Sequence, residues 1–147
     1  MENNMLMQFK DLGAILVLAL SAVGSGWGAG LAGMAAIGAW KKNFAQNKAA
    51  SFMLVVFVAA PLTQTVYGMI VMRQLMAIAN KGQFLWSIGA FSGLAIGLSA
   101  LWQGKCAACA CDAFGESGKG FAQNFVVLGM TETVAIFVLA FSMMVPL

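Results

Sequence analysis

The stretch AASFMLVVFVAAPLTQTVYGMIVM, residues 49–72, lies between Lys48 and Arg73 and contains no charged side chain. An α-helix rises about 1.5 Å per residue, so about 20 apolar residues cross the hydrocarbon core of a membrane, which is about 30 Å thick. These residues are long and apolar enough for that crossing. The stretch therefore predicts a membrane-spanning helix.

The same pattern occurs three more times. No charge lies between Asp11 and Lys41 or between Lys81 and Lys105, and residues 120–147 hold only one. The sequence therefore predicts an all-α membrane protein with very little chain outside the membrane. We expect four transmembrane helices, over roughly residues 10–41, 48–79, 83–113 and 118–146.

The composition of the chain excludes several classes of protein. Of its 147 residues, 61% are hydrophobic and 9% are charged, which is far from the composition of a soluble enzyme or of a disordered chain. The net charge of +3 is too small and too scattered for a nucleic-acid surface. The chain has no histidine, so the most common metal ligand and general base are absent.

The first apolar segment also has some features of a cleaved signal peptide. Lys10 precedes an apolar run that contains small residues. However, Glu2 and Asp11 disturb the basic leader, and the apolar run is longer than a signal peptide requires. We therefore expect this segment to be a structural helix.

The two halves of the chain repeat one another. Gly13 and Gly28 recur as Gly89 and Gly104 at an offset of 76 residues. We expect two tandem helical hairpins, residues 1–81 and 82–147, that enter the membrane from the same side. The second helices align Thr63-Gln64-Thr65-Val66 with Thr131-Glu132-Thr133-Val134, so one carboxylate serves four helices.

Glu132 is the chemically distinctive residue of this pattern. A charged side chain at the centre of a membrane helix costs about 3 kcal/mol on insertion scales, and such residues usually mark a path for ions or protons. Burial disfavours the charged form of a carboxyl group. We expect Glu132 to be protonated or paired with a cation. A purely structural hydrogen bond to a neighbouring helix is the alternative.

Several oxygen-bearing groups are predicted to lie at a similar depth. Helix 3 offers Gln103, and Pro61 in helix 2 should free the carbonyl of Phe57 and kink the helix. Polar groups on neighbouring membrane helices are often simple hydrogen-bonding partners, but their number around one carboxylate favours a binding site. One face of helix 2 carries Ala60, with its backbone carbonyl, and Thr63, Gln64 and Tyr67.

These residues resemble a known family. The chain is similar over nearly its whole length to the proteolipid of V-type (V/A-type) rotary ATPases, most closely to subunit K of the sodium-type bacterial branch. The resemblance implies that Glu132, Gln103, Gln64, Thr63 and the Ala60 carbonyl bind the ion, with Tyr67 fixing the Glu132 side chain. The matching strings are Pro61-Leu62-Thr63-Gln64, Tyr67-Gly68, Gln103-Gly104-Lys105, Glu132-Thr133 and Ala135-Ile136.

The resemblance also implies a function and partners. The chain would form a c/K ring of identical subunits, with helices 1 and 3 inside and helices 2 and 4 outside. The ring would carry Na⁺ or H⁺ past an arginine of a stator subunit and rest on a central stalk subunit at the hairpin loops. The ATP site would lie on other subunits, so this chain would not itself be catalytic; Glu132 would be its ion-carrying group.

The distribution of basic residues gives an orientation. Lys41, Lys42, Lys48, Lys105 and Lys119 lie towards the two hairpin loops, against Lys10, Arg73 and Lys81 on the other side. Basic residues favour the cytoplasm, so we expect cytoplasmic hairpin loops and both termini outside, in a bacterial cytoplasmic membrane. Lys105 itself has two possible roles, to snorkel to the interface or to neutralise Asp112.

The choice of ion follows from the number of oxygens. A proton needs one acceptor, whereas a dehydrated hard cation needs several oxygen ligands. The set above supplies about five, which favours Na⁺, although such a site can also operate with H⁺.

Two motifs and two other functions compete with this interpretation. Gly28, Gly30 and Gly33 satisfy G-x-G-x-x-G but lack a preceding strand, so we expect helix packing. Small-residue packing is also expected of C-x-x-C-x-C at 106–111, because zinc sites need four ligands. A small four-helix drug or cation antiporter that uses one glutamate, and a membrane scaffold without transport, remain alternatives. An antiporter of that kind carries the glutamate in its first helix, and a scaffold does not need ligands around Glu132.

Overall fold

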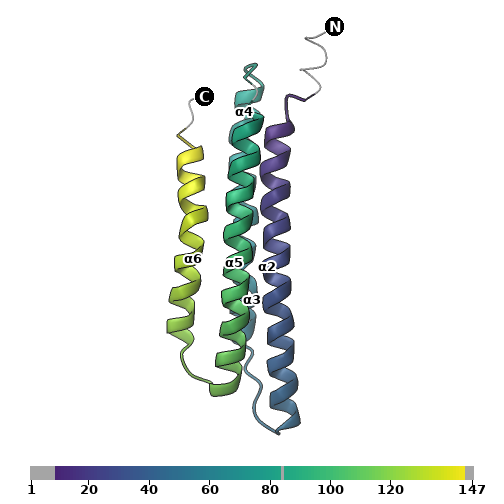
Figure 1. Ribbon diagram of the computed structural model, residues 1–147, viewed down its shortest axis with the longest axis vertical. Coiled ribbons are helices and arrows are strands. Elements are labelled where there is room, and N and C mark those ends of the chain that lie inside the picture. The colour runs from purple at the N-terminus through teal and green to yellow at the C-terminus, as the bar shows by residue number, and fades with distance from the viewer. Residues whose placement is uncertain (1–8, 84, 145–147) are drawn as a thin grey trace.

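The computed structural model describes residues 9–83 and 85–144, and within them the chain forms four long helical segments side by side (Figure 1). Each segment is long and apolar enough to cross a membrane, and α3, η1 and α4 together make one of them. The expected all-helical membrane protein is therefore confirmed. The elements are α2 (Leu12–Ala45), α3 (Leu54–Ala59), the 3-10 turn η1 (Ala60–Leu62), α4 (Thr63–Ala79), α5 (Trp86–Ser117) and α6 (Phe121–Ser142).

Two helices extend further than the charge pattern suggests. The first was expected to end near residue 41 and the third near 113, but α2 continues to Ala45 and α5 to Ser117. Their last turns are joined: Lys42 forms an ion pair with Glu116 at 3.0 Å, and the Asn43 side chain donates to the Gly115 carbonyl at 3.0 Å. Polar residues outside the hydrocarbon thus extend the helices because each finds a partner on the other. The predicted helix end at 146 lies outside the described residues.

The connections between these helices are short, and α2 and α5 end in left-handed backbone. Asn47 follows α2 with φ of 51°, and Gly118 follows α5 with φ of 65°. The Gly118 N–H donates to the Phe114 carbonyl at 2.8 Å, which closes the last turn. Gly118 and Gly120 both have positive φ, and this lets α6 start within a few residues of the end of α5.

Pro61 interrupts the second spanning segment as expected, but the effect on the carbonyls is different from the prediction. The chain tightens into the 3-10 turn η1, with Pro61 buried in it. The Phe57 carbonyl is not left free, because it accepts the N–H of Ala60. The Ala60 carbonyl accepts the N–H of Thr63 in the same way. The proline therefore shortens the backbone hydrogen bonds from four to three residues instead of leaving one unmade.

Glycines bring α2 and α5 into backbone contact. A Cβ added to Gly104 would overlap the backbone of Gly28, and one added to Gly89 would overlap Gly13. The positions that repeat in the sequence therefore lie against each other in space. Close approach through small residues is the usual way in which membrane helices associate. Gly28 thus has the packing role expected for it, whereas a Cβ at Gly30 would meet nothing within 4 Å.

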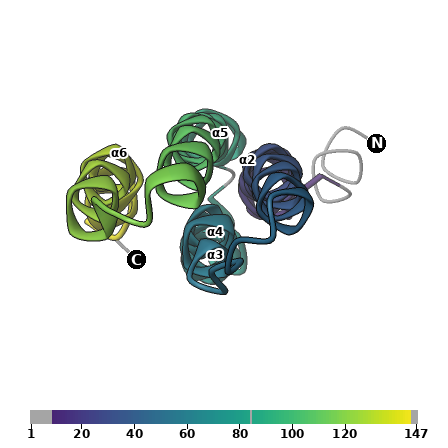
Figure 2. The ribbon, with the colours of Figure 1, turned by 90° about the horizontal axis from the view of Figure 1, so that it is seen from below.

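Seen along the helices, α2 and α5 lie next to each other, α3 and α4 cover the groove between them, and α6 lies on the other side of α5 (Figure 2). This arrangement places α4, α5 and α6 around one point. Phe57, Phe114 and Phe121 pack ring against ring near the hairpin loops, with centroids 5.1–5.9 Å apart. The polar residues of α4, α5 and α6 converge farther along the bundle.

The glycine contact leads to a stability prediction. We expect Gly104→Ala to destabilise the detergent-solubilised protein by about 1–3 kcal/mol, because the added Cβ has no space beside Gly28 and the helices must separate. Thermal unfolding followed by circular dichroism measures this. The matched control is Gly38→Ala, where the new Cβ would meet open space; equal effects of the two substitutions would contradict the prediction.

Candidate functional site: a carboxylate shared by three helices

Glu132 is held by two hydroxyl groups from the first hairpin. The Thr63 hydroxyl and the Tyr67 hydroxyl each donate to Glu132 Oε1 at 2.6 Å. Thr63 and Tyr67 are both in α4, one turn apart, so they reach α6 from the same helix face. Hydrogen bonds of this length to a carboxylate are among the stronger ones in proteins.

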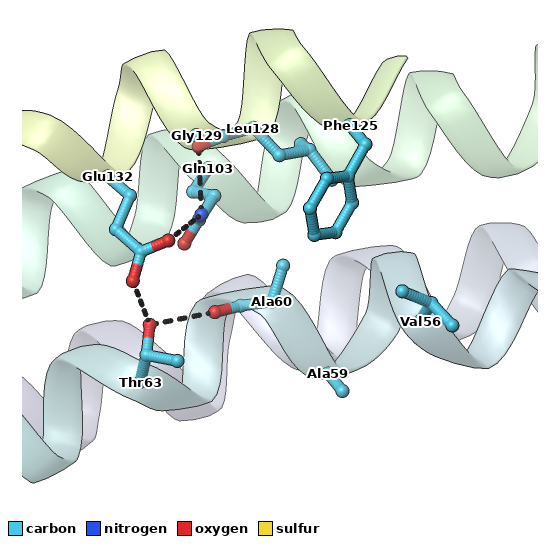
Figure 3. Close-up of a pocket in the computed structure, with 9 residues that line it drawn as sticks. All are labelled: Val56, Ala59, Ala60, Thr63, Gln103, Phe125, Leu128, Gly129 and Glu132. Carbon is cyan, nitrogen blue, oxygen red and sulfur yellow. Dashed lines mark hydrogen bonds between the residues drawn. The ribbon is translucent and has the colours of Figure 1, made fainter. Parts of the chain in front are cut away.

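Gln103 of α5 contacts the other oxygen of the carboxylate. Its Nε2 lies 3.3 Å from Glu132 Oε2 and donates to the Leu128 carbonyl at 2.9 Å (Figure 3). Leu128 lies one turn before Glu132 on α6. The amide of Gln103 therefore connects α5 to both the backbone and the carboxylate of α6.

A pair of amides lies behind the carboxylate. Gln64 Nε2 donates to Gln103 Oε1 at 2.6 Å, and both side chains are 0% exposed. A buried amide without a partner is costly, whereas these two satisfy each other. Gln64 occupies the position that aligns with Glu132 in the repeat, and it points to α5.

Oxygen atoms crowd around the Thr63 hydroxyl. Thr63 Oγ1 lies 3.1 Å from the Ala60 carbonyl oxygen, 3.2 Å from Gln64 Oε1 and 2.6 Å from Glu132 Oε1. A hydroxyl has one hydrogen and can donate it to only one of these three acceptors. The other oxygen–oxygen contacts have no hydrogen between them. Such a cluster suits a hard cation, which takes several oxygen ligands at once.

The cluster lines a cavity of about 280 Å³. Figure 3 shows Thr63, Gln103 and Glu132 at one side of it, and the ring of Phe125 beside Ala60. Glu132 is only partly buried and Thr63 is exposed, because α4 and α6 leave the site uncovered on the side away from α5. An ion can therefore reach the carboxylate from the surface of the bundle without crossing its core.

No basic side chain neutralises Glu132 within the described part of the chain. Among residues 9–83 and 85–144, the single ion pair is Lys42–Glu116 at the hairpin loops. A carboxylate in a membrane needs a partner of opposite charge or a proton. Glu132 therefore requires a proton, an ion or a second protein.

The structure brings together all six positions that the sequence suggested. Thr63, Tyr67 and Gln103 contact Glu132 directly, and the Ala60 carbonyl and Gln64 contact Thr63. Sequence reasoning did not find the Leu128 carbonyl that orients Gln103, because a backbone acceptor in a regular apolar helix has no sequence signal.

The other polar or reactive residues lie away from this site. Lys105 stacks over the ring of Trp102, with Nζ 4.0 Å from the ring centroid. This contact was not anticipated. Cys111 is buried, with its sulfur 3.8 Å from the Leu54 carbonyl oxygen, and Cys106 and Cys109 are also free thiols. In the described residues no three His, Cys, Asp or Glu side chains cluster as metal ligands.

The fold and the site define a membrane proteolipid, a small apolar chain of spanning hairpins that holds one acidic side chain between its helices. Residues 87–145 match the family model for the C-subunit of ATP synthase. Over 129 residues the chain is 34% identical to the A-type ATP synthase subunit K of Methanocaldococcus jannaschii. This alignment covers 86% of the chain and 56% of the relative, so the chain spans little more than half of that protein's length.

Together with the four spanning helices, these matches assign the chain to the rotor proteolipids of V/A-type ATPases and ATP synthases. The matches favour this family over a four-helix antiporter. The matched segment of the family model contains both Gln103 and Glu132.

The geometry predicts that Glu132 is selectively modified by an apolar carbodiimide. Such reagents partition into lipid and react with a protonated carboxyl, and Glu132 is the acidic residue that lies inside a spanning segment next to an open cavity. We expect the mass of the reagent on the peptide that contains residue 132 and no modification of Glu132→Gln. Glu116, which is exposed and paired with Lys42, is the internal control; modification there with Glu132 spared would contradict the prediction.

Proposed function

We propose that this chain is the rotor-ring subunit of a V/A-type ATPase or ATP synthase and that Glu132 carries the transported ion across the membrane. The single observation that supports this most is the oxygen cluster around Thr63 and Glu132, which three helices build in a membrane-spanning bundle. The family assignment supports the same function. The ATP site belongs to other subunits, so the chain contributes transport and not hydrolysis.

Na⁺ is the ion that we propose, with H⁺ as the alternative. Glu132, Thr63, Gln64, Gln103 and the Ala60 carbonyl each offer an oxygen at or next to the cluster. A proton site needs one acceptor, and further buried polar groups would only add to the cost of placing the site in lipid. Tyr67 donates to Glu132 Oε1 and holds the carboxylate in place.

Two small changes would turn the observed cluster into a loaded site. The Thr63 hydroxyl would rotate its hydrogen away from Glu132, and its oxygen would then face the ion together with the carboxylate. The Gln103 amide already donates to the Leu128 carbonyl and needs little movement. The site is therefore largely formed before the ion binds.

The cycle follows from the cost of a bare charge in lipid. With a cation or proton bound, the Glu132 site is neutral and can face the hydrocarbon. An arginine on a stator subunit would displace the ion and neutralise the empty carboxylate. Moving one charge against the membrane potential requires about 2.3 kcal/mol per 100 mV, which the rotation would supply or use.

The proposed assembly is a ring of identical subunits in the cytoplasmic membrane. The glycine-rich α2 and α5 would face the inside of the ring, and α4 and α6 would carry the site on the outside. The excess of basic residues near the connections 46–53 and 118–120 supports a cytoplasmic position for these loops, where the central stalk would bind. Both termini would lie outside, and a bacterial host stays a prediction from the sequence.

The sodium proposal predicts a sodium-dependent activity. The purified complex should hydrolyse ATP faster as Na⁺ rises from trace to tens of millimolar at fixed, mildly alkaline pH. Thr63→Ala and Gln103→Ala should each raise the half-maximal Na⁺ concentration by roughly tenfold, since the loss of one polar ligand costs about 1.5 kcal/mol. Thr133→Ala, whose hydroxyl donates to Gly129 on its own helix, is the matched control. Activity that does not respond to Na⁺ would leave a proton rotor.

A second prediction tests the role of Glu132 itself. Glu132→Gln keeps the shape and one oxygen acceptor but removes the charge that alternates during the cycle. Ion uptake into vesicles should fall to background while the ring remains detectable on a native gel. Gln64→Ala changes the neighbouring amide and should weaken ion binding without abolishing transport. Retained uptake by Glu132→Gln would exclude Glu132 as the carrier.

A further inference from the structure

Each of the two glycine-rich helices has a contact face towards the other and an exposed face with the same spacing. α2 meets α5 through residues 17, 20, 24 and 28, and α5 exposes residues 91, 94, 98 and 102, each 74 positions later. In the other direction, α5 meets α2 through 89, 93, 97, 100 and 104. α2 leaves 15, 19, 23, 26 and 30 exposed, each 74 positions earlier. The two exposed faces therefore repeat the two faces that already bind each other.

We propose that the exposed face of α5 binds the exposed face of α2 in a second copy of this chain, with Trp102 seated on Gly26 and Gly30 and Asp112 beside Lys41 of that copy. The inference rests on the proposed ring and specifies which residues join its subunits. Such a contact is head-to-tail, because the two faces differ, and repetition of a head-to-tail contact closes into a ring when the rotation allows it.

The position of Trp102 follows from the contact inside the chain. Gly28 lies between Ala100 and Gly104 of α5. The shift of 74 residues turns Gly28 into Trp102, and turns Ala100 and Gly104 into Gly26 and Gly30. Trp102 is 58% exposed, and a Cβ at Gly26 or Gly30 would meet nothing within 4 Å. A large ring thus faces bare backbone that has room to receive it.

The groove beside Trp102 supports the same docking. A cavity of about 350 Å³ lies between α5 and α6, lined by Ala95, Leu98, Ser99, Trp102, Thr131 and Val134. Inside the chain, α5 lies against both α2 and α4 (Figure 2). The α2 helix of a second copy would occupy the corresponding place against α5 and α6.

Charge complementarity at the cytoplasmic end commits the surface to this occupant. Ala39 contacts Gly115 within the chain, and the shift of 74 residues turns this pair into Ala113 and Lys41. Asp112, next to Ala113, and Lys41 are both exposed and of opposite charge. Neither belongs to the single ion pair of the described residues, which joins Lys42 and Glu116.

Disulfide crosslinking tests the proposal. In a chain whose three cysteines are replaced by alanine, Asp112→Cys with Lys41→Cys should give a ladder of covalent multimers on a denaturing gel after oxidation of the detergent-purified ring. The matched control is Asp112→Cys with Lys42→Cys, because Lys42 faces α5 of its own chain. We expect at least about tenfold less multimer from the control, since a disulfide requires Cα atoms within about 7 Å.

Two further variants test the seat of Trp102. Trp102→Ala should lower the temperature at which the native ring dissociates, whereas Trp27→Ala, which removes an equally exposed indole from a groove of its own chain, should not. Asp112→Lys should weaken the ring, and Lys41→Asp in the same chain should restore it. Rings that form without a 41–112 ladder and tolerate Trp102→Ala would overturn these contacts and leave the proposed function standing. If the unmodified chain forms no ring, the proposed function itself fails.

Discussion

The backbone contact between α2 and α5 is the constraint on which the rest of the molecule depends. Because Gly13 lies on Gly89 and Gly28 on Gly104, the two hairpins are fixed at one depth relative to each other. This depth brings Gln103 to the level of Gln64 and Glu132. A slip of one helical turn, about 5.4 Å, would separate every hydrogen bond of the site that joins two helices. The glycines therefore position the oxygens although they contribute none.

Much of the architecture could be predicted from the sequence, because the membrane restricts the choices. Charge-free runs of at least about 20 residues leave helices as the practical solution, and Glu132 is too costly in lipid to be incidental. The repeat showed which residues of α4 belong beside it. Helix ends were less predictable: α2 and α5 run past Lys41 and residue 113 because side chains of one helix bind the other. Such contacts between distant residues leave no local pattern.

The orientation of polar side chains also lay beyond the sequence. The Phe57 carbonyl was expected to be free, but a 3-10 turn pairs it with the N–H of Ala60. Gln64 was expected as one of several equivalent ligands, yet its amide nitrogen is committed to Gln103 and only its oxygen faces Thr63. Lys105 found an aromatic ring where a carboxylate had been considered. In each case two or three partners of similar energy compete, and packing decides among them.

The enclosure of Gln64 has a consequence for how this motor would be geared. One base change in a glutamine codon gives a glutamate codon, so a second acid in the first hairpin is always close in mutation. At position 64, however, the side chain is 0% exposed and paired with Gln103, whereas Glu132 borders an open cavity. An acid at 64 would have no outlet for its ion and would be only a burden to folding. Four helices therefore remain the tooth size of the proposed wheel, which turns through a large angle for each ion and so favours force over volume.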